Sequence, residues 1–524
     1  MRPAPDTARL AFVLTLLAVG TAGADDEIFD VIELTDVGRV VTADVADFDG
    51  DGSKDLMLVT LDGMPPDEVR SIHVHRQTRV GQFSPSPDLS VILPPDVAVY
   101  DIADIEEAPG EELILLRPDR VTVIALSESD GTPRDWFIDG PTTLGVAEDE
   151  RGFERFRLAY DEFDDRPWIL VPQFGALSLL TAEGQLQVRL DVGRRANYYV
   201  ASGSGLLSVE SDMQLYYDAP KISVGDIDGD GQADILTATR HELRVFLRGP
   251  DGEFKARADY AEPLELIDET DHRRGTSSVV TSARDIDADG RLDLMISHIE
   301  GTMVSTVTNT RIYFNRDGGW DLAEPDEEFV VDGAVTSNLL VNIDRSEVLE
   351  LVRLQFKFSI LELVELLLTR KIDTEILIHR LQADARFGEE PWSRKKISTG
   401  ISFDTFRPKG FMPRAGLDLN ADGLMDFISS ANGDGIEIFL GGEKGPFDRR
   451  TAIQKLPATG EIYIEDVDAD GLPDFVLFDP QSLEPIVRIG LNRGVLPGTP
   501  DATARRAREN GIGFDEDGDT DEAR

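Results

Sequence analysis

Short runs of apolar residues, many of them alternating with polar ones, follow one another along most of this chain. Runs of this kind, bounded by Gly, Pro, Asn or Asp, are typical of β-strands. The first runs predict four consecutive strands at Arg39–Ala46, Asp55–Leu61, Ser71–Gln77 and Leu89–Leu93, preceded by one more at Glu27–Leu34. The pattern therefore predicts an all-β protein.

Five of the turns between predicted strands share one nine-residue pattern of Asp, any residue, Asp or Asn, any residue, Asp, Gly, two further residues and Asp. The copies are Asp47–Asp55 (DFDGDGSKD), Asp226–Asp234 (DIDGDGQAD), Asp285–Asp293 (DIDADGRLD), Asp418–Asp426 (DLNADGLMD) and Asp466–Asp474 (DVDADGLPD). Oxygen-bearing side chains at alternate positions of a tight loop can point at one centre, and calcium binds six to eight oxygens at about 2.3–2.6 Å. The pattern therefore predicts five calcium loops.

The loop positions predict how each ion is held. Positions one, three, five and nine supply side-chain oxygens, and glycine at position six permits the sharp turn. Position seven varies and includes arginine and leucine, which cannot coordinate calcium, so we expect its backbone carbonyl to be the ligand. The predicted ligand residues are Asp47, Asp49, Asp51, Ser53, Asp55, Asp226, Asp228, Asp230, Gln232, Asp234, Asp285, Asp287, Asp289, Arg291, Asp293, Asp418, Asn420, Asp422, Leu424, Asp426, Asp466, Asp468, Asp470, Leu472 and Asp474.

Other interpretations of these loops fit less well. An EF-hand needs a glutamate at position twelve and a helix on each side, and neither is present. Acidic turns without metal are the remaining alternative, which a single copy would leave open and which five repeated copies disfavour.

Three weaker copies continue the series at Asp104–Glu112 (DIEEAPGEE), Tyr160–Trp168 (YDEFDDRPW) and Asn342–Glu350 (NIDRSEVLE). They keep the flanking strands but lose the ligand set, so we expect them to be free of metal. The eight loops repeat with a mean period of about 60 residues, which is typical of repeat architectures. Four short strands fit in one period, and four-stranded units repeated radially form a β-propeller. We expect eight blades, with seven as the alternative.

A second signal recurs on the third strand of three units. Val245-Phe246-Leu247, Ile312-Tyr313-Phe314 and Ile438-Phe439-Leu440 each lead to a glycine turn and an aromatic residue, which is Phe254, Trp320 or Phe447. With the five loops, this pattern resembles the FG-GAP/VCBS repeat family, whose propellers include the integrin alpha-subunit head. The resemblance covers nearly the whole chain after the N-terminus. It implies a propeller with calcium in the loops between the first two strands of a blade.

The ends of the chain predict how the ring closes. After the last loop only two strands are evident, Phe475–Phe478 and Pro485–Leu491, whereas the strand at Glu27–Leu34 precedes the first unit. We expect this N-terminal strand to complete the last blade, which would remove a free sheet edge.

One unit is longer than the others, and its surplus predicts a helical insertion. Ser359 to Glu362 forms a capping-box pattern, apolar residues follow at helical spacing, and Arg370 and Lys371 suit the C-terminal end. This predicted helix at 359–371 either packs against its own blade or forms a docking surface.

Composition limits the class of partner. The chain has 100 acidic and 52 basic residues and a net charge of −48. Nucleic acid and anionic lipid are therefore poor partners, because phosphate binding depends on lysine and arginine. A protein or a glycan is the better candidate, and we expect a monomer.

The N-terminus predicts export. Arg2 and Arg9 precede an apolar stretch and an Ala22-Gly23-Ala24 cleavage pattern, which together indicate a signal peptide at residues 1–24. An uncleaved anchor is the alternative, although the apolar run is short for a membrane span. There is no cysteine, so stability must come from the core and calcium. We expect a propeller at 25–498, an acidic disordered tail at 499–524, no transmembrane segment after cleavage, and a periplasmic, surface or secreted location.

Two functions from different classes are compatible with the sequence. The preferred one is a non-catalytic, adhesion-like module that binds a protein or glycan, with calcium as a structural clamp. The alternative is a calcium-dependent polysaccharide hydrolase or lyase with its site at the central channel. No catalytic motif is present. His73 and His75 share one strand face without a third ligand for a transition metal, and the charged loop 268–275 is a weaker ligand-binding candidate.

Overall fold

The structure is a computed structural model, and it describes residues 27–500 with gaps. The gaps are residues 36, 65–66, 80, 128–130, 144–152, 165, 195, 203–210, 218, 265, 267–276, 303–304, 317, 333, 344–345, 358–364, 367, 383–385, 404–406, 431, 443–449 and 483–484. The predicted signal peptide and nearly all of the predicted acidic tail lie outside the described residues, as does the loop 268–275.

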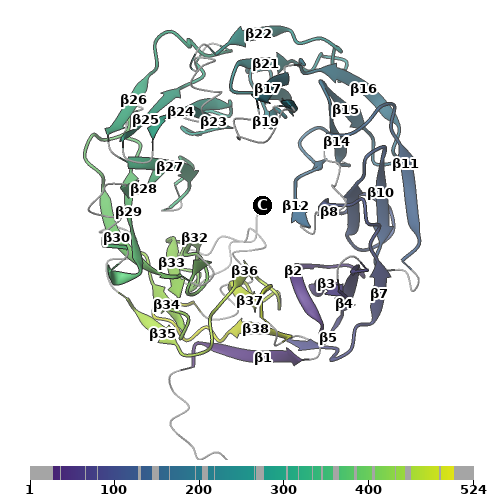
Figure 1. Cartoon of the computed structure of the whole chain (residues 1–524), viewed down its shortest axis with the longest axis vertical. Helices are drawn as coiled ribbons and strands as arrows, with labels where there is room; N and C mark the ends of the chain where they lie inside the picture. The colour runs from purple at the N-terminus through teal and green to yellow at the C-terminus, as the bar shows by residue number, and fades with distance from the viewer. Residues whose placement is uncertain are drawn as a thin grey trace, which may run out of the picture.

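Eight antiparallel sheets of four main strands are arranged in a ring around a central channel (Figure 1), which confirms the predicted eight-bladed propeller. Blade 1 is β2 (Arg39–Ala46), β3 (Asp55–Asp62), β4 (Val69–His75) and β7 (Leu89–Ile92). Blade 2 is β8 (Val99–Ala103), β9 (Glu112–Leu116), β10 (Arg120–Ala125) and β11 (Pro133–Phe137). Blade 3 is β13 (Ala159–Tyr160), β14 (Trp168–Gln173), β15 (Ala176–Leu180) and β16 (Leu186–Asp191). Blade 4 is β19 (Lys221–Gly225), β20 (Asp234–Ala238), β21 (Glu242–Phe246) and β22 (Tyr260–Pro263).

The second half of the ring repeats the same order. Blade 5 is β23 (Ser277–Arg284), β24 (Asp293–Thr302), β25 (Ser305–Tyr313) and β26 (Glu327–Asp332). Blade 6 is β27 (Ala334–Val341), β28 (Glu350–Lys357), β29 (Lys371–His379) and β30 (Ser393–Ser402). Blade 7 is β32 (Arg414–Leu417), β33 (Asp426–Ser430), β34 (Ile436–Phe439) and β35 (Ala452–Gln454). Blade 8 is β36 (Glu461–Glu465), β37 (Asp474–Phe478), β38 (Ile486–Asn492) and, from the other end of the chain, β1 (Phe29–Thr35).

The ring closes as the sequence predicts. Strand β1 pairs antiparallel with β38 in an unbroken register from Phe29 opposite Asn492 to Thr35 opposite Ile486. The two strands lie side by side in Figure 1 although they come from opposite ends of the chain. This pairing holds both ends of the described chain in one sheet.

The antiparallel order gives the ring two distinct faces. In blade 1, each strand runs opposite to its neighbour, and the other blades repeat this order. The loops that join the first and second strands of a blade therefore all open on one side, which we call the loop face. The turns between second and third strands, and the connections from blade to blade, open on the other side, which we call the opposite face.

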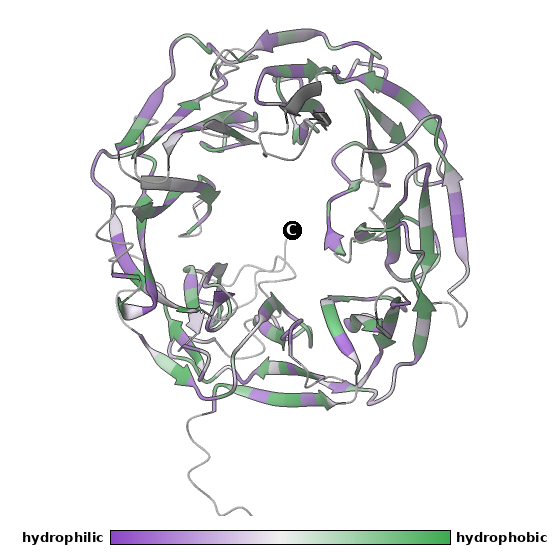
Figure 2. Ribbon diagram, viewed as in Figure 1, coloured by the Kyte–Doolittle hydropathy of each residue, from purple (hydrophilic) through white to green (hydrophobic). Residues whose placement is uncertain are grey.

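The core lies between neighbouring blades. The second strands are the most buried: every residue of β9, β14, β20 and β37 is buried. One cluster joins Leu34 and Val476 of blade 8 to Val45 and Leu56 of blade 1. In Figure 2 the middle strands of blade 2 are mostly hydrophobic whereas β11, at the outer edge, is mostly hydrophilic. The hydrophobic faces of adjacent sheets thus hold the ring together.

Several elements were not predicted. Strand β12 (Glu154–Arg155) pairs parallel with β8 on the channel side of blade 2, and β31 (Arg407–Pro408) extends the sheet of blade 6. The hairpins β5 (Gln77–Arg79) with β6 (Gln82–Phe83), and β17 (Ala196–Ser202) with β18 (Ser211–Tyr217), are separate two-stranded sheets.

The predicted helical insertion is described only in part. Residues 365–366 and 368–369 are helical, while 358–364 and 367 lie outside the described residues. Arg370 has φ 57°, and its N–H donates to the Leu366 carbonyl at 2.8 Å, so the helix ends there in a left-handed residue. Lys371, predicted as the last residue of the helix, instead begins β29. The long strands β29 and β30 account for part of the extra length of this repeat unit. In the described part of the chain, no helix is long and apolar enough to cross a membrane.

Candidate functional site

Acidic side chains converge in four of the five predicted metal loops. Carboxylate oxygens lie within 4.8 Å of one another in the groups Asp47–Asp49–Asp51, Asp226–Asp228–Asp230, Asp285–Asp287–Asp289 and Asp466–Asp468–Asp474. Oxygens that bind one calcium ion from opposite sides are separated by about twice the 2.3–2.6 Å ligand distance. The spacing is therefore compatible with one shared cation per loop.

The backbone of each loop is held in the left-handed region at two positions. Position six is always glycine, with φ between 82° and 89°, and position four is also left-handed at Gly50, Gly229, Ala288, Ala421 and Ala469. A Cβ added to Gly52 would meet nothing within 4 Å, so conformation rather than space requires glycine there. The left-handed alanines at position four were not predicted, because alanine gives no sign of that conformation.

Carboxylates at positions one and five accept hydrogen bonds from the backbone of their own loop. In the first loop, Asp47 accepts hydrogen bonds from the N–H groups of Gly50 at 2.7 Å and Gly52 at 2.9 Å, and Asp51 accepts from Ser53 at 2.8 Å. The loop at Asp285 repeats these contacts at Gly290 and Arg291. Backbone donors therefore preorganise the acidic groups before any ion binds.

The carboxylate at position nine lies beneath the loop and joins it to the sheet. In the loop at Asp285, Asp293 accepts from the N–H of Ile286 at 2.8 Å and from that of Asn315 at 2.7 Å. The equivalent Asp234, Asp426 and Asp474 each accept two such backbone bonds. Burial is the main cause that raises the pKa of these aspartates: to about 6 for Asp234, about 7 for Asp55, Asp293 and Asp426, and about 8 for Asp474.

Orphaned oxygens show that the donor set fits a cation. Asp49 Oδ1, Asp55 Oδ2 and Asp287 Oδ1 are buried and have no hydrogen-bond partner among the described residues. A buried carboxylate oxygen without a donor is costly, and neighbouring carboxylates in the same loop raise the cost further. A hard divalent cation would coordinate these oxygens and offset the free-energy cost of burying their negative charge.

The loop at Asp418 differs from the other four. As placed, the Asn420 amide nitrogen donates to the Pro497 carbonyl at 2.7 Å and to Asp422 at 3.0 Å, and its oxygen accepts from the Asp422 N–H at 3.3 Å. The amide therefore makes contacts within the protein in a position where the other loops have a carboxylate. Only positions one, five and nine carry a charge in this loop.

At two of the position-seven residues, Leu472 and Arg291, the side chain makes contacts elsewhere. Leu472 is fully buried in the core, and Arg291 donates to the Arg316 carbonyl at 2.7 Å. Neither side chain offers an oxygen, so only the backbone carbonyl is available as a ligand at these positions.

Two of the three weaker loops keep the position-nine contact, and two contain an acidic side chain paired with arginine. Glu112 accepts from the Ile105 N–H at 3.0 Å and Glu350 from that of Ile343 at 2.8 Å, and burial raises the pKa of Glu112 to about 7. Glu106 pairs with Arg134, and Asp164 pairs with Arg248 at 2.8 Å. The first of these loops and the loop at 160 thus contain a guanidinium beside their acidic side chains.

Contacts between loops link each blade to the next. The backbone N–H of the residue at position eight donates to a backbone carbonyl in the loop of the preceding blade. These bonds run from Glu111 to Asp47, from Leu292 to Asp226, from Leu349 to Ile286 and from Met425 to Ile343. Side-chain amides at the ends of third strands also donate to backbone carbonyls of the preceding loop. Gln77 of blade 1 donates to the Val467 carbonyl of blade 8 at 2.9 Å, Asn315 donates to the Ile227 carbonyl and Asn492 to the Leu419 carbonyl. These bonds join neighbouring loops directly, a connection that no local motif reveals.

A buried polar cluster lies at the channel wall between blades 8, 1 and 2. Asp44 accepts from Arg155 Nη1 at 3.2 Å, from the Tyr100 hydroxyl at 3.2 Å and from the Val45 N–H at 2.9 Å. Asp101 accepts from the N–H groups of Leu158 at 2.7 Å and Ile102 at 2.9 Å, and from Arg155 Nε at 3.5 Å. Both carboxylates are therefore fully engaged.

The tyrosines of this cluster are held in the protonated form. Burial, followed by the charge of Asp44, raises the pKa of Tyr100 and of Tyr463 above the usual value for a phenol. Tyr100 also stacks on Phe153, with ring centroids 4.3 Å apart.

Two cavities border the channel. The larger, about 1110 Å³, is lined by inner strands of blades 3 to 6 and includes Lys221, Arg284 and the exposed Val280. The smaller, about 590 Å³, lies between blades 7, 8, 1 and 2 and includes Asp44, Arg155 and Tyr463. The histidines suggested as a transition-metal pair are used otherwise: His73 contacts Thr60 and Ser90, and His75 contacts the Ser84 carbonyl.

Comparison with known families confirms the resemblance predicted from the loops. Residues 226–296 and 418–477 match the family described as FG-GAP-like repeat, and these regions contain four of the five complete loops. The chain therefore contains FG-GAP-like repeats. A search of curated proteins finds no significant match.

Solved structures resemble the chain only distantly. They include a lectin of Agrocybe aegerita that recognises non-reducing terminal N-acetylglucosamine, with 13% identity over 71% of this chain and 90% of that one and a TM-score of 0.36. The V. cholerae biofilm matrix protein Bap1 has 11% identity, coverage of 91% and 89%, and a TM-score of 0.33. A point mutant of the NanB sialidase from Streptococcus pneumoniae has 9% identity, coverage of 91% and 72%, and a TM-score of 0.28. At this level of similarity they support no conclusion about ligand or activity.

Proposed function

We propose that this FG-GAP-repeat propeller is an exported, calcium-binding module that binds a protein or glycan without catalysis, and that its calcium ions are structural. The convergent carboxylates and the orphaned oxygens of Asp49, Asp55 and Asp287 support the calcium assignment. The backbone bonds from one loop to the next explain how ions at the loop face stabilise the ring. The N-terminal signal-peptide pattern supports export.

The observation that carries the non-catalytic assignment is the state of Asp44 and Asp101, the two buried carboxylates at the channel wall. A glycosidase pair needs one carboxyl group that protonates the leaving group and a second that acts as base or nucleophile. Asp44 and Asp101 instead share one arginine and accept backbone N–H bonds. Carboxylate oxygens that already accept this many hydrogen bonds are poorly placed to act on a substrate. This cluster is suited to joining blades 8, 1 and 2.

The neighbouring tyrosines give no catalytic alternative. A phenol can act as nucleophile or base only when it loses its proton, and burial beside Asp44 opposes this for both Tyr100 and Tyr463. The channel cavities are therefore interpreted as binding surfaces.

A binding screen combined with a hydrolysis assay tests this function. The mature chain, residues 25–524, is immobilised in millimolar calcium and exposed to a glycan array and to a panel of extracellular proteins. We expect a saturable ligand that is recovered intact. Release of new reducing ends or unsaturated sugars from a bound polysaccharide, lost in the Asp44→Asn variant, would replace the binding module with an enzyme.

A further inference from the structure

Three arginines converge on one edge of blade 8, at the mouth of the smaller channel cavity. Arg414 Nη2 donates to the Ile462 carbonyl at 3.4 Å, and Arg39 Nε donates to the Pro480 carbonyl at 3.5 Å. Turned so that its oxygen faces the guanidinium, the Gln481 amide accepts from Arg407 Nη2 at 2.8 Å. All three arginines line the cavity of about 590 Å³. Blade 8 thus gathers guanidinium groups from three separate segments.

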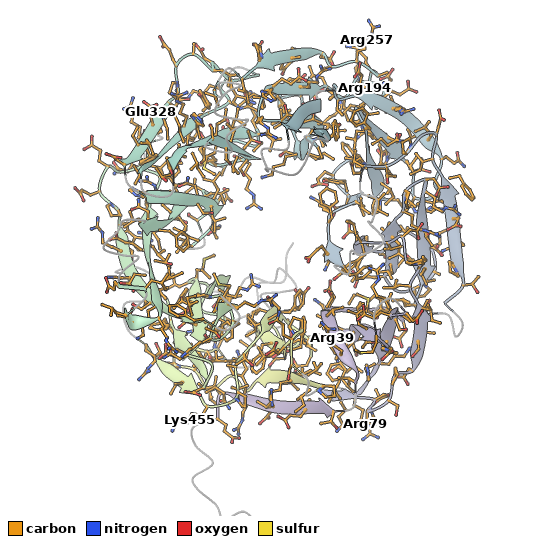
Figure 3. All side chains as sticks on the ribbon, in the orientation of Figure 1. Arg39, Arg79, Arg194, Arg257, Glu328 and Lys455 are labelled. Carbon is orange, nitrogen blue, oxygen red and sulfur yellow. The ribbon has the colours of Figure 1, made fainter. Side chains whose placement is uncertain are left out.

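This cavity lies on the opposite face. Arg39 and Arg414 are the first residues of the inner strands β2 and β32, and Pro480 and Gln481 follow the second strand of blade 8. These are the ends of the strands that point away from the metal loops. In Figure 3, Arg79, Arg257 and Lys455 project from the outer rim, whereas Arg39 lies inward of them. A ligand could therefore enter here without touching the calcium loops.

The charges of the arginines are poorly compensated by the protein. Within the described residues, Arg407 and Arg414 form no ion pair with a carboxylate, and the nearest carboxylate oxygen to Arg39 is that of Glu68 at 4.0 Å. Like charges held close together repel one another, and a bound anion would relieve that repulsion. Guanidinium groups are well suited to this because they bind carboxylates through two parallel hydrogen bonds.

The same cavity also contains hydrogen-bond acceptors. Glu154 of β12 and Glu461 of β36 line it, are exposed, and form no ion pair with any described residue. Carboxylates repel an anion but accept hydrogen bonds from hydroxyl groups. A ligand that complements both sets must carry an acidic group and several hydroxyls. An acidic sugar has this chemistry, whereas an acidic peptide offers charge with few hydroxyls.

We propose that this cavity binds an acidic sugar of an extended glycan, with Arg39, Arg407 and Arg414 holding its carboxylate and with Glu154 and Glu461 accepting bonds from its hydroxyls. The inference rests on the proposed binding function and specifies the class of its ligand. Arg155 is already engaged by Asp44 and Asp101 and shapes the inner wall.

Isothermal titration with defined oligosaccharides tests the proposal. Tetragalacturonate is compared with its methyl ester, which keeps the hydroxyls and loses the charges, and with tetraglutamate, which keeps the charges and loses the hydroxyls. Oligomers of glucuronate and mannuronate are included as alternative acidic sugars. We expect at least one acidic sugar to bind, and its methyl ester and tetraglutamate each to bind about tenfold more weakly or worse. The affinity should fall as salt is raised.

Variants then locate the site. Arg414→Gln and Arg407→Gln should each weaken the acidic sugar about tenfold, while Arg257→Gln at the outer rim should bind as the unaltered chain does. Equal melting temperatures verify that each variant is folded. Equal affinity for sugar and ester, tighter binding of tetraglutamate, unchanged affinity in both variants, or no binding of any acidic sugar overturns the proposal. A neutral glycan that binds independently of Arg414 would leave the binding function standing and remove this inference alone.

Discussion

The five complete loops and the three weaker ones occupy equivalent places in the ring, yet they balance their acidic side chains differently. In the loops at Asp226 and Asp285, no carboxylate of positions one, three or five forms an ion pair with a described residue. In two of the weaker loops, Arg134 pairs with Glu106 and Arg248 pairs with Asp164. In these two weaker loops an arginine compensates part of the acidic charge, as Arg76 does for Asp49 at 3.5 Å in the first complete loop.

The comparison also separates two roles within one motif. Position nine accepts a backbone N–H in the complete loops and in two of the three weaker ones, as Asp293 and Glu112 show. Among the described residues, convergent carboxylates occur only in complete loops, at positions one, three and five in three of them and at positions one, three and nine in the loop at Asp466. Position nine therefore serves the fold in both classes of loop and also adjoins the predicted metal group in the complete ones, whereas positions one, three and five differ between the classes.

Removal of calcium gives the largest expected effect. Each of the five proposed ions would contribute about 2.7 kcal/mol when free calcium is 100 times the dissociation constant. Excess chelator should lower the melting temperature by more than about 10 °C, and added calcium should restore it. Melting curves by circular dichroism check this. Coinciding curves with and without chelator would remove the metal from the complete loops and erase the distinction between the two classes.

A single ligand substitution should have the next largest effect. Asp289→Asn keeps an acceptor for the Arg291 N–H and removes one charge from the ligand group. We expect one fewer calcium ion per chain by elemental analysis and about 2–3 kcal/mol less stability in calcium, with little change in chelator. Asp230→Asn should act likewise at its own loop.

The matched control is Glu106→Gln in the first weaker loop. It removes an ion pair with a half-exposed arginine, which is worth less than about 1 kcal/mol, and should leave the ion count unchanged. Asp344, in the third weaker loop, lies outside the described residues. Equal losses of calcium in Asp289→Asn and Glu106→Gln would contradict the division between the loops.

Substitution at position nine should affect both classes. Asp293→Ala and Glu112→Ala each leave a buried backbone N–H without its acceptor, at a cost of about 1–3 kcal/mol per group. Urea unfolding in chelator should show a loss in both variants. If Asp293→Ala lost stability in calcium but neither variant lost stability in chelator, position nine would serve the metal alone.

Much of the architecture could be predicted because each repeat carries its own local signal. The aspartate string, its period and the unmatched strand at the N-terminus predicted eight blades and their closure by β1. These features depend on residues that are near one another in sequence or on simple counting.

The rest depends on the assembled ring. Arg39 of blade 1, Arg407 of β31 and Arg414 of blade 7 line one cavity only because blade 8 closes the ring between blades 7 and 1, and nothing local marks them. The left-handed alanine at Ala288 looks like any other alanine in sequence. The hairpin of β17 and β18 lies between two blades and follows no repeat.

A smaller effect is expected from pH, again at position nine. The pKa of Glu112 is raised by burial to about 7 from 4.5, so the folded chain keeps a proton between about pH 4.5 and 7 that the unfolded chain has lost. Stability should therefore fall as pH rises through this window. Glu112→Gln lacks this group, so its stability relative to the unaltered chain should rise by on the order of 1–3 kcal/mol from pH 5 to 8.

Measuring both chains in saturating calcium cancels the titration of the metal loops, which the two share. Urea unfolding at a series of pH values gives the difference directly. A constant difference would show that Glu112 titrates alike in the folded and unfolded chains, and that burial in the weaker loop has not changed its acidity.

Position seven should give the smallest effect and tests the motif most finely. Arg291 contributes a backbone carbonyl to the predicted ligand set, while its side chain bonds to the Arg316 carbonyl. Arg291→Ala keeps that carbonyl, so we expect the ion count to stay unchanged and stability to fall by less than about 1 kcal/mol. Elemental analysis beside Asp289→Asn makes the comparison within one loop. Loss of an ion from Arg291→Ala would mean that the complete loops depend on side-chain contacts at position seven as well as on their own carboxylates.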